Sequence, residues 1–436
     1  MEIGRTLRNI FSRIARTFTQ LAFIAMLVLA DRAFADFLYV VTGESDNWTQ
    51  AIDTSTNQIF DTIVGPSNSS ANFIAITPDG SFAYVTNGGD DTVIVISLAT
   101  NTIVATIPVG MQPEGIAITP NGKFAYVANQ LGATENISVI DLSTNTVSAT
   151  IDLGTVGAFA VAATPDSRFV YVTDSFQGLV EVIDTSINMS VGVITVGNDP
   201  MGIAITPNGQ FAYVTNFNDD SISVIDLSTN MVSDTIGPPL TEGADVYGIA
   251  VSPDGSIVYA VEPHFVNVID TSTNMIVNSI SLPSGSKGQQ VVFSLDGAFA
   301  YVTINAGFVD VIDTTTSMII EEIPLNTEAT TTLGIATTFG VATPNNFSGC
   351  QKKNDFGVAY EFFNTLVWQP NSLGRPAAGY LIFRNGVQIA SLNASTFKYQ
   401  DHNIKKGASY TYTIIAVLSN GVPSVAATIT VPCSGM

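Results

Sequence analysis

The sequence predicts an all-β protein: a seven-bladed β-propeller closed by a C-terminal strand and followed by a β-sandwich. Two repeated segments predict the propeller, and each of them occurs seven times between residues 36 and 344. A tandem repeat of 42 to 46 residues that can be divided into four short strands is typical of propeller blades. The composition changes after Pro344, which predicts a second all-β domain over residues 345–436.

The first 35 residues differ from the rest of the chain. Four arginines, Arg5, Arg8, Arg13 and Arg16, precede an apolar run over residues 21–30, and small residues flank Phe34 in the sequence Ala-Phe-Ala. This pattern predicts a signal peptide over residues 1–35 that is cleaved near Ala35, and hence a secreted, periplasmic or cell-surface protein. The apolar run is about half the length of a transmembrane helix, so an uncleaved anchor is the less favoured alternative.

Each repeat unit predicts four strands. The first segment is typified by TPNGKFAYVAN at 119–129, and its tyrosine recurs at 39, 84, 126, 171, 213, 259 and 301; the second is typified by VIDLSTN at 139–145. Alternation of apolar and polar residues predicts strands at 115–119, 124–129, 137–141 and 146–152. Pro120 and Gly122 favour a type I turn between the first two strands. The Asp, Ser, Thr and Asn side chains of 141–145 favour a tight turn between the last two.

The two ends of the repeat region predict a closed ring. The mature chain begins with a second-strand segment at 37–43, and one unpaired first strand, TTLGIATTFG, follows the seventh unit at 331–340. Pairing of these two segments would complete the first blade and leave no exposed sheet edge. An open solenoid is the alternative arrangement.

The repeated motifs AYVTN, TPDG or TPNG, and VIDLSTN resemble those of the YVTN-repeat β-propeller family. That family includes bacterial secreted proteins and domains similar to those of archaeal surface-layer proteins, so the resemblance implies an exported interaction or scaffolding protein. It brings no catalytic signature with it. The two tryptophans, Trp48 and Trp368, are not repeated, which distinguishes the pattern from that of WD-type propellers.

The C-terminal region resembles the fibronectin type III family. The resemblance rests on Trp368, a hairpin at 379–390 with an Asn-Gly turn, and the Gly-x-x-Tyr of residues 407–410. It implies an adhesive or spacing module in which Trp368 lies in the core and Tyr410 is the corner tyrosine. Cys350 and Cys433 flank this region, and in an exported protein they predict a disulfide, with two free thiols as the alternative.

Charge and histidine content exclude two classes of function. Residues 36–344 carry 32 acidic and three basic residues, a balance of −29, which excludes nucleic acid as a partner of this region because a phosphate backbone would be repelled. The chain has only two histidines, His264 and His402, which excludes a histidine-based haem or copper centre.

The loops that differ between units predict the binding face, because variable loops on a rigid scaffold usually carry binding residues. These loops join the second to the third strand and join successive blades; Glu114 and Asp199 belong to the second kind. We expect a protein or glycan partner, and no cofactor. The candidate residues of the binding face are Glu44, Asp46, Trp48, Glu135, Asp174, Phe176, Glu262 and His264.

A calcium site is a weaker prediction, based on the hard oxygen ligands of Asp90, Asp91, Asp219 and Asp220. The alternative is that these aspartates only form turns. The inner-strand segments, such as GIAIT at 115–119, contain no ionisable side chain, so general acid or base catalysis at the central channel is not expected. The sequence therefore predicts a non-enzymatic binding or scaffold protein, with a metal-assisted, lactonase-like hydrolase or lyase as the alternative.

Overall fold

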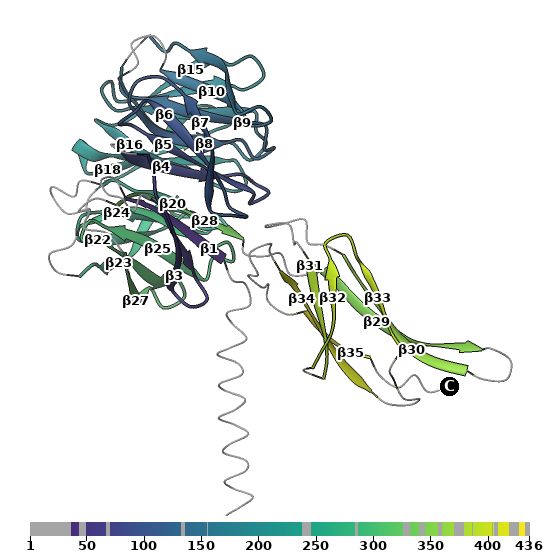
Figure 1. Cartoon of the computed structure of the whole chain (residues 1–436). Coiled ribbons are helices and arrows are strands. Elements are labelled where there is room, and N and C mark those ends of the chain that lie inside the picture. Colours follow the sequence, from purple (N-terminus) through teal and green to yellow (C-terminus); the bar gives the residue numbers. More distant parts are fainter. Residues whose placement is uncertain are drawn as a thin grey trace, which may run out of the picture.

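The computed structural model shows an almost entirely β protein (Figure 1). The structure describes residues 36–42, 49–66, 70–131, 136–154, 156–237, 246–283, 287–325, 332–339, 345–355, 360–369, 379–385, 387–402, 404, 409–417 and 427–431. The predicted signal peptide lies outside these residues. Within the described ranges the one helix is a 3-10 turn, η1 (Phe217–Asp219), and none of the described helical structure could cross a membrane.

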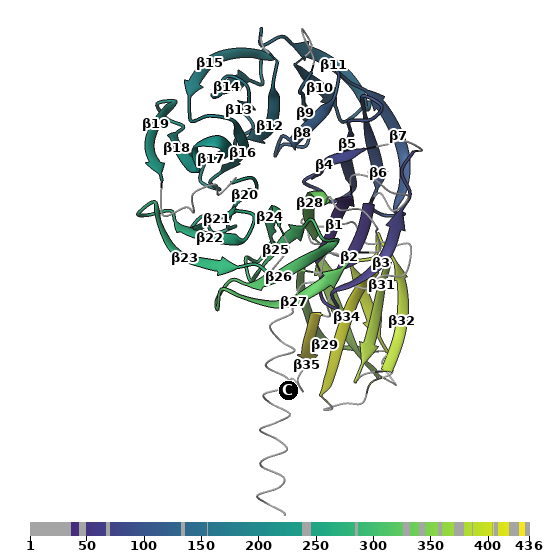
Figure 2. The ribbon, with the colours of Figure 1, turned by 90° about the vertical axis from the view of Figure 1, so that its left-hand side faces the viewer.

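Seven four-stranded antiparallel sheets surround a common axis (Figure 2), which confirms the predicted seven-bladed propeller for the described residues. Blade 1 contains β28 (Thr332–Phe339), β1 (Asp36–Thr42), β2 (Thr49–Asp53) and β3 (Gln58–Ile63). Blade 2 contains β4 (Ala71–Ile76), β5 (Phe82–Asn87), β6 (Thr92–Ser97) and β7 (Thr102–Pro108). Blade 3 contains β8 (Pro113–Ile118), β9 (Phe124–Asn129), β10 (Ile137–Asp141) and β11 (Thr146–Ile151).

The remaining blades follow in chain order. Blade 4 contains β12 (Ala158–Ala163), β13 (Phe169–Asp174), β14 (Leu179–Asp184) and β15 (Met189–Thr195). Blade 5 contains β16 (Pro200–Ile205), β17 (Phe211–Asn216), β18 (Ser221–Asp226) and β19 (Met231–Ile236). Blade 6 contains β20 (Ile249–Val251), β21 (Ile257–Val261), β22 (Phe265–Asp270) and β23 (Met275–Ser281). Blade 7 contains β24 (Gly288–Phe293), β25 (Phe299–Ile304), β26 (Phe308–Asp313) and β27 (Met318–Pro324).

The ring closes as predicted, by pairing of the last propeller strand with the first. β28 runs antiparallel to β1, with Ile335 opposite Val40 and Phe339 opposite Asp36. The hydrophobic side chains of β1 divide between two interblade clusters: Tyr39 packs toward blade 2, and Leu38 packs toward blade 7. The first blade is therefore held to both neighbours by residues from the two ends of the repeat region.

The two repeated segments meet between blades. The tyrosine of one blade's second strand donates a hydrogen bond to the asparagine that ends the turn of the next blade. Such bonds join Tyr39 to Asn101 at 3.0 Å, Tyr84 to Asn145 at 2.5 Å, Tyr126 to Asn188 at 2.6 Å, Tyr171 to Asn230 at 2.7 Å and Tyr213 to Asn274 at 2.8 Å. These asparagines have φ between 52° and 54°, in the left-handed region that asparagine tolerates better than most residues. We call these contacts the Tyr–Asn latches.

The innermost strands pack so closely that their glycines cannot be replaced without a clash. A Cβ atom on Gly115 would lie 2.4 Å from the Phe159 carbonyl oxygen, and one on Gly248 would lie 2.4 Å from the Gln289 carbonyl oxygen. Glycine is required here because the backbones of neighbouring blades touch around the axis.

After β28, seven strands form two sheets. One contains β29 (Asn345–Asp355), β30 (Tyr360–Gln369) and β33 (Lys398–Asp401); the other contains β32 (Val387–Asn393), β31 (Gly379–Arg384), β34 (Tyr410–Val417) and β35 (Ala427–Val431). Trp368 is fully buried between them and lies edge-to-face with Tyr380 at 5.5 Å, so the core position predicted for this tryptophan is confirmed. The likeness to fibronectin type III domains stays a prediction.

Candidate functional site

Several of the predicted binding-face residues lie outside the described part of the chain, namely Glu44, Asp46, Trp48 and Glu135. Of the remaining four, Asp174 ends strand β13, and Phe176, Glu262 and His264 lie in the predicted loops. The four side chains differ in exposure. The carboxylates of Asp174 and Glu262 are buried: Asp174 accepts hydrogen bonds from the backbone N–H groups of Phe176 and Gln177, and Glu262 accepts one from Asn267. Phe176 and His264 are exposed, so only these two of the four present their side chains on the surface.

The four aspartates considered as calcium ligands lie in loops of two different blades, where three of them accept hydrogen bonds from neighbouring residues. Asp91 accepts a hydrogen bond from the backbone N–H of Gln112 at 2.8 Å, and Asp219 accepts one from the backbone N–H of Asn198 at 2.7 Å. Asp91 and Asp220 have positive φ, and Asp90 accepts a bond from Asn87. Among the described residues, no group of three or more His, Cys, Asp or Glu side chains is arranged to hold a metal.

Exposed apolar side chains gather on the loops of blades 3 and 4. Met111, Leu131, Val156 and Phe176 are all exposed, and Phe176 retains 62% of its accessible surface. Backbone contacts make them neighbours: Leu131 N–H donates to the Met111 carbonyl, and Gly157, next to Val156, donates to the Gln130 carbonyl and lies against the Phe176 ring. We call these four residues the loop patch. A cluster of exposed apolar residues on a propeller surface is typical of an interaction surface.

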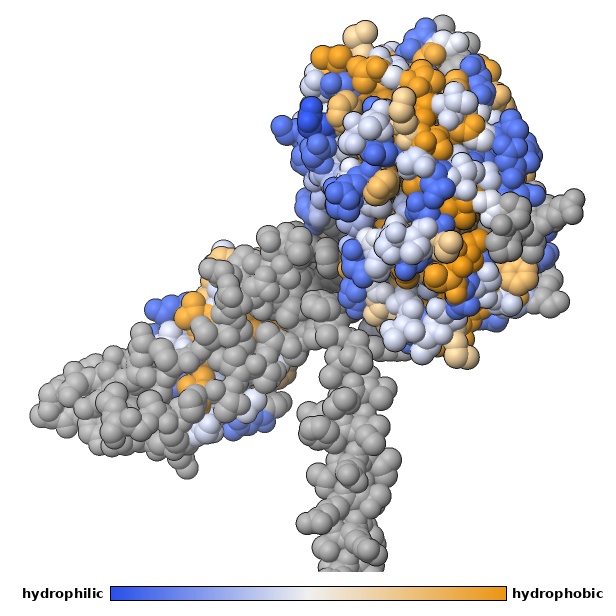
Figure 3. All heavy atoms as spheres, turned by 180° about the vertical axis from the view of Figure 1, so that it is seen from behind, coloured by the Kyte–Doolittle hydropathy of each residue, from blue (hydrophilic) through white to orange (hydrophobic). Residues whose placement is uncertain are grey.

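Other exposed apolar residues are spread around the rim. Met189, Met231, Met275 and Met318 each begin the outermost strand of one blade, and all four are exposed. On the side of the molecule shown in Figure 3, hydrophobic residues of the propeller are interspersed with hydrophilic ones. Since these methionines occupy the same position in each of blades 4 to 7, they follow from the repeat rather than from one specific site.

Four aromatic rings converge at the axis. Phe73 of blade 2 lies edge-to-face with Phe159 of blade 4 at 5.9 Å, and Phe159 lies edge-to-face with Tyr247, which precedes β20 of blade 6, at 6.1 Å. Phe217 of the blade 5 loop completes the group at 6.4 Å from Tyr247. Blades 2, 4 and 6 are not neighbours in the ring (Figure 2), so Phe73, Phe159 and Tyr247 reach one another across the axis. We call these four rings the axial cluster.

Two carboxylates, Glu114 and Asp199, influence the axial cluster electrostatically through Tyr247. Burial raises the pKa of Glu114 to about 7, although the Gln112 side chain donates a hydrogen bond to it at 3.2 Å, and burial also raises the pKa of Asp199. Burial, and then the charges of Glu114 and Asp199, raise the pKa of the Tyr247 hydroxyl. Gln112 also donates to Gln130 at 3.0 Å, which links Glu114 to the loop that carries Leu131. The axial cluster and the loop patch therefore belong to the same end of the propeller.

The expectation that the inner strands carry no ionisable side chain at the channel is corrected by this geometry. β8 begins at Pro113, two residues before the predicted strand, so Glu114 belongs to an inner strand and not to a connection. The corresponding positions in blades 2, 4, 5, 6 and 7 hold Asn72, Phe159, Met201, Tyr247 and Gln289. The residue type at this position differs from blade to blade, as expected for a site that occurs once in the ring. A comparison of repeats looks for residues that recur, so it does not find such a position.

The opposite end of the blades carries recesses between the repeated turns. One recess of about 610 Å³ lies between blades 2 and 3, and another of about 290 Å³ lies between blades 4 and 5. Polar groups of these turns form hydrogen bonds within the turn itself. Asp79, for example, accepts hydrogen bonds from the Thr77 hydroxyl and from the backbone N–H of Ser81. These recesses follow from the packing of repeated turns and are weaker candidates than the axial cluster.

A further carboxylate with a raised pKa lies inside blade 7. Asp310 is fully buried, and neither of its oxygens has a hydrogen-bond partner among the described residues. Burial and the charge of Glu322 raise its pKa to about 7. In blades 3 and 5 the matching third-strand residue is a serine bonded by the asparagine that ends the second strand, as Ser138 is by Asn129, whereas Ile304 ends the second strand of blade 7. Asp310 thus lacks the asparagine partner that the matching serines of blades 3 and 5 have, because Ile304 takes the place of that asparagine.

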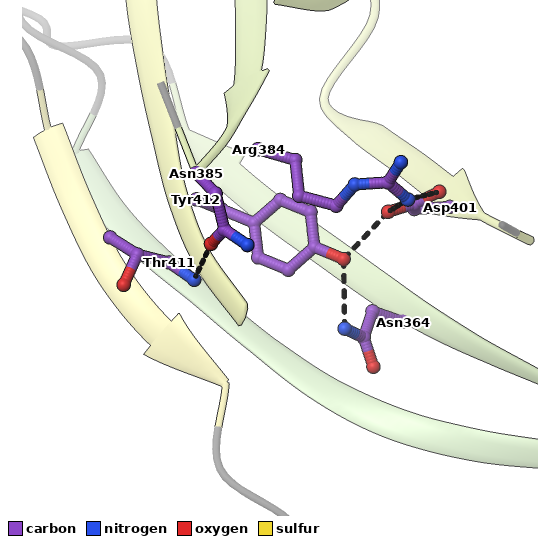
Figure 4. A network of polar contacts seen from close by, with 6 residues as sticks. All are labelled: Asn364, Arg384, Asn385, Asp401, Thr411 and Tyr412. Carbon is purple, nitrogen blue, oxygen red and sulfur yellow. Dashed lines mark hydrogen bonds and ion pairs between the residues drawn. The ribbon is translucent and has the colours of Figure 1, made fainter. Parts of the chain in front are cut away.

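In the C-terminal unit a polar network joins the two sheets (Figure 4). Tyr412 donates a hydrogen bond to Asp401 at 2.7 Å and accepts one from Asn364 at 2.8 Å, and Arg384 pairs with Asp401 at 2.9 Å. Of the two tyrosines on β34, Tyr412 is therefore the buried one, and the predicted corner residue Tyr410 is only half-buried, under the Arg384 guanidinium. The Cys350 side chain and Cys433 lie outside the described residues, so the disulfide stays a prediction.

Comparisons with known proteins agree with the fold. The model of a family described as "Lactonase, 7-bladed beta-propeller" matches residues 40–151, which span the first three blades. Among solved structures, a functionally unknown protein from Desulfotomaculum acetoxidans DSM 771 is similar, with a TM-score of 0.60, 21% identity and coverage of 70% of this chain and 99% of that one. Hydrazine synthase from Kuenenia stuttgartiensis is similar with a TM-score of 0.53, 18% identity and coverage of 60% and 88%. No curated protein matches the sequence significantly. At these identities the likeness concerns the β-propeller fold alone.

Proposed function

We propose that this chain is an exported, non-enzymatic binding or scaffold protein whose propeller engages a protein at the cell envelope or exterior, with the C-terminal unit as a spacer or tether. The loop patch is the observation that supports this proposal. Met111, Leu131, Val156 and Phe176 come from four separate connections, and their apolar side chains are exposed together. Burial of such a cluster against a partner is favourable by about 25 cal/mol for each Å² of apolar surface removed from water.

The test compares the loop patch with another exposed apolar surface of the propeller. A partner would first be captured from envelope fractions by crosslinking and purified, and its affinity for the protein would then be measured by surface plasmon resonance. The double variant Leu131→Ser/Phe176→Ser should weaken this affinity at least roughly tenfold, as hot-spot residues of an interface do. The control, Met231→Ser/Met275→Ser, removes exposed methionines of the rim and should leave the affinity unchanged. Equal losses in the two double variants would refute the assignment of the loop patch.

A lactonase-like hydrolase is the second candidate. The family match over residues 40–151 favours it, and so does a carboxyl group at the axis, Glu114, whose pKa of about 7 suits general acid or base catalysis near neutral pH. A panel of lactones would be assayed at pH 7 with and without divalent cations. Turnover that is lost in Glu114→Gln and kept in Glu322→Gln would support hydrolysis, and absence of turnover in the unmodified protein would remove this candidate.

A further inference from the structure

We infer that the axial cluster, together with Glu114 and Asp199, is a binding site for an organic ammonium group. The inference rests on the proposed binding function and names the chemistry that its loop face recognises. The ammonium group could belong to a small molecule or to a lysine side chain of the protein partner; the same chemistry would hold either one.

The rings meet at right angles, as the walls of an ammonium-binding cage do. The interplanar angles are 89° for Phe73 and Phe159, 85° for Phe159 and Tyr247, and 82° for Phe217 and Tyr247. Aromatic ring faces attract a cation within about 6 Å of the ring centroid, and the attraction grows when the cation is removed from water. Phe73, Tyr247 and Phe217 are only partly buried, so the cluster retains surface that a ligand can reach.

The carboxylates beside the rings lack a cationic counterpart. Glu114 accepts its hydrogen bond from the neutral Gln112 amide, Asp199 accepts one from the Asn218 amide at 3.2 Å, and neither forms an ion pair within the described part of the chain. The desolvation of Glu114 is not offset by a neighbouring positive charge, which is why its pKa is raised. A bound ammonium group would supply that charge, and the surplus of 29 negative charges over residues 36–344 would attract cations to this region.

The Tyr247 hydroxyl adds a polar acceptor at the same place. It makes no hydrogen bond to the described residues, although the charges of Glu114, from blade 3, and Asp199, from blade 5, both act on it. Rings, carboxylates and a hydroxyl without a partner therefore converge from blades 2 to 6. None of these features is needed by the repeat, because the corresponding positions in other blades hold different residue types.

The experiment is isothermal titration calorimetry on the full protein with two matched pairs of probes. Choline is compared with 3,3-dimethylbutan-1-ol, its neutral isostere, and Nα-acetyl-lysinamide is compared with Nα-acetyl-norleucinamide. At least one ammonium compound should bind roughly tenfold or more tightly than its neutral analogue, as expected for a partly desolvated cation against aromatic rings. Preference for choline indicates a small-molecule ligand, and preference for the lysine derivative indicates a side chain of the partner.

Three variants assign the binding to this site. Glu114→Gln and Tyr247→Leu should each weaken ammonium binding at least fivefold, whereas Glu322→Gln, which removes an exposed charge of the outer strand β27, should not. Binding in the unmodified protein should also strengthen from pH 6 to pH 8 as Glu114 ionises, and Glu114→Gln should abolish this change. Thermal melting of each variant separates loss of binding from loss of folding.

The inference would be overturned if neither ammonium compound bound, or if the neutral analogues bound equally well. Equal weakening by Glu322→Gln would also overturn it, since general surface charge would then explain the affinity. If ammonium binding fails while Leu131→Ser/Phe176→Ser still weakens partner binding, the proposed function stands without this site.

Discussion

Removal of a Tyr–Asn latch should destabilise the propeller, whereas removal of the equivalent hydroxyl between blades 6 and 7 should not. Tyr126→Phe deletes the hydroxyl that donates to Asn188 at 2.6 Å, and Tyr126 is fully buried. Tyr259 is also buried, but Ser317 stands where the other turns have asparagine, and the Tyr259 hydroxyl makes no hydrogen bond of good geometry to the described residues. Burial raises the pKa of Tyr259, and the neighbouring Ser317 hydroxyl offsets only part of that rise. Tyr126→Phe and Tyr259→Phe therefore both remove a buried tyrosine hydroxyl, but only Tyr126→Phe breaks a Tyr–Asn latch.

The expected loss of stability depends on how deeply the acceptor asparagine is buried. Asn188 is half-buried, so water can replace part of the lost bond, and Tyr126→Phe should lower the free energy of unfolding by about 1 kcal/mol. The latches of Tyr84, Tyr126 and Tyr171 share no partner, so the triple Phe variant should lose about 3 kcal/mol. For a unit of about 300 residues this corresponds to a decrease in Tm of roughly 5 °C.

Differential scanning calorimetry measures these shifts. Tyr259→Phe should leave the Tm unchanged or raise it slightly, because it removes a buried hydroxyl that lacks a good partner. Ser317→Asn should raise the Tm, because it restores the asparagine. Equal decreases for Tyr126→Phe and Tyr259→Phe would show that the latch hydrogen bond contributes nothing, and that the recurring tyrosine is explained by the packing of its ring alone.

Three further substitutions test other parts of the fold. Gly248→Ala places a Cβ 2.4 Å from the Gln289 carbonyl oxygen and should cost about 2 kcal/mol or more, whereas Gly237→Ala, with nothing within 4 Å, should be neutral; equal urea midpoints would contradict this packing. Asp310 has a pKa raised to about 7, so its burial destabilises the native state progressively from about pH 4 up to pH 7; Asp310→Asn should raise the Tm at pH 8 and change it little at pH 4.5, and a shift independent of pH would count against this. Asp401→Asn leaves the partly buried Arg384 without its ion pair and should destabilise the C-terminal unit by about 2 kcal/mol, which an unchanged unfolding transition of that unit would disprove.

The blades and their closure could be predicted because each depends on residues that recur. Alternating patterns located β9, β10 and β11 to within a residue, and the unpaired strand at the end of the repeat region indicated the β1–β28 pairing. The repetition of Tyr126 and Asn188 was visible as well. Its cause was not, because the two side chains meet between blades and belong to residues 62 positions apart.

The axial cluster could not be predicted in the same way. Comparison of repeats defines an inner strand by the residues that recur, such as Gly115 to Ile118, and it assigns the variable residue before them to a connection. Glu114 and Tyr247 occupy that variable position, and they come together only because seven inner strands surround one axis. Tyr410 and Tyr412 show the same limit in the C-terminal unit. The two residues lie on one face of β34, and the position of Asp401 on another sheet decides which tyrosine is buried.

The pairing of β1 with β28 also determines how the ring would respond to mechanical load. Asp36, which begins β1, lies opposite Phe339, which ends β28. A pull between Asp36 and the chain that follows Phe339 would act on one end of an antiparallel ladder and open its hydrogen bonds pair by pair, instead of shearing all of them at once. Under tension along the chain, blade 1 would be the first to give way, while the other six blades, whose strands are consecutive in sequence, would carry no force until it had opened.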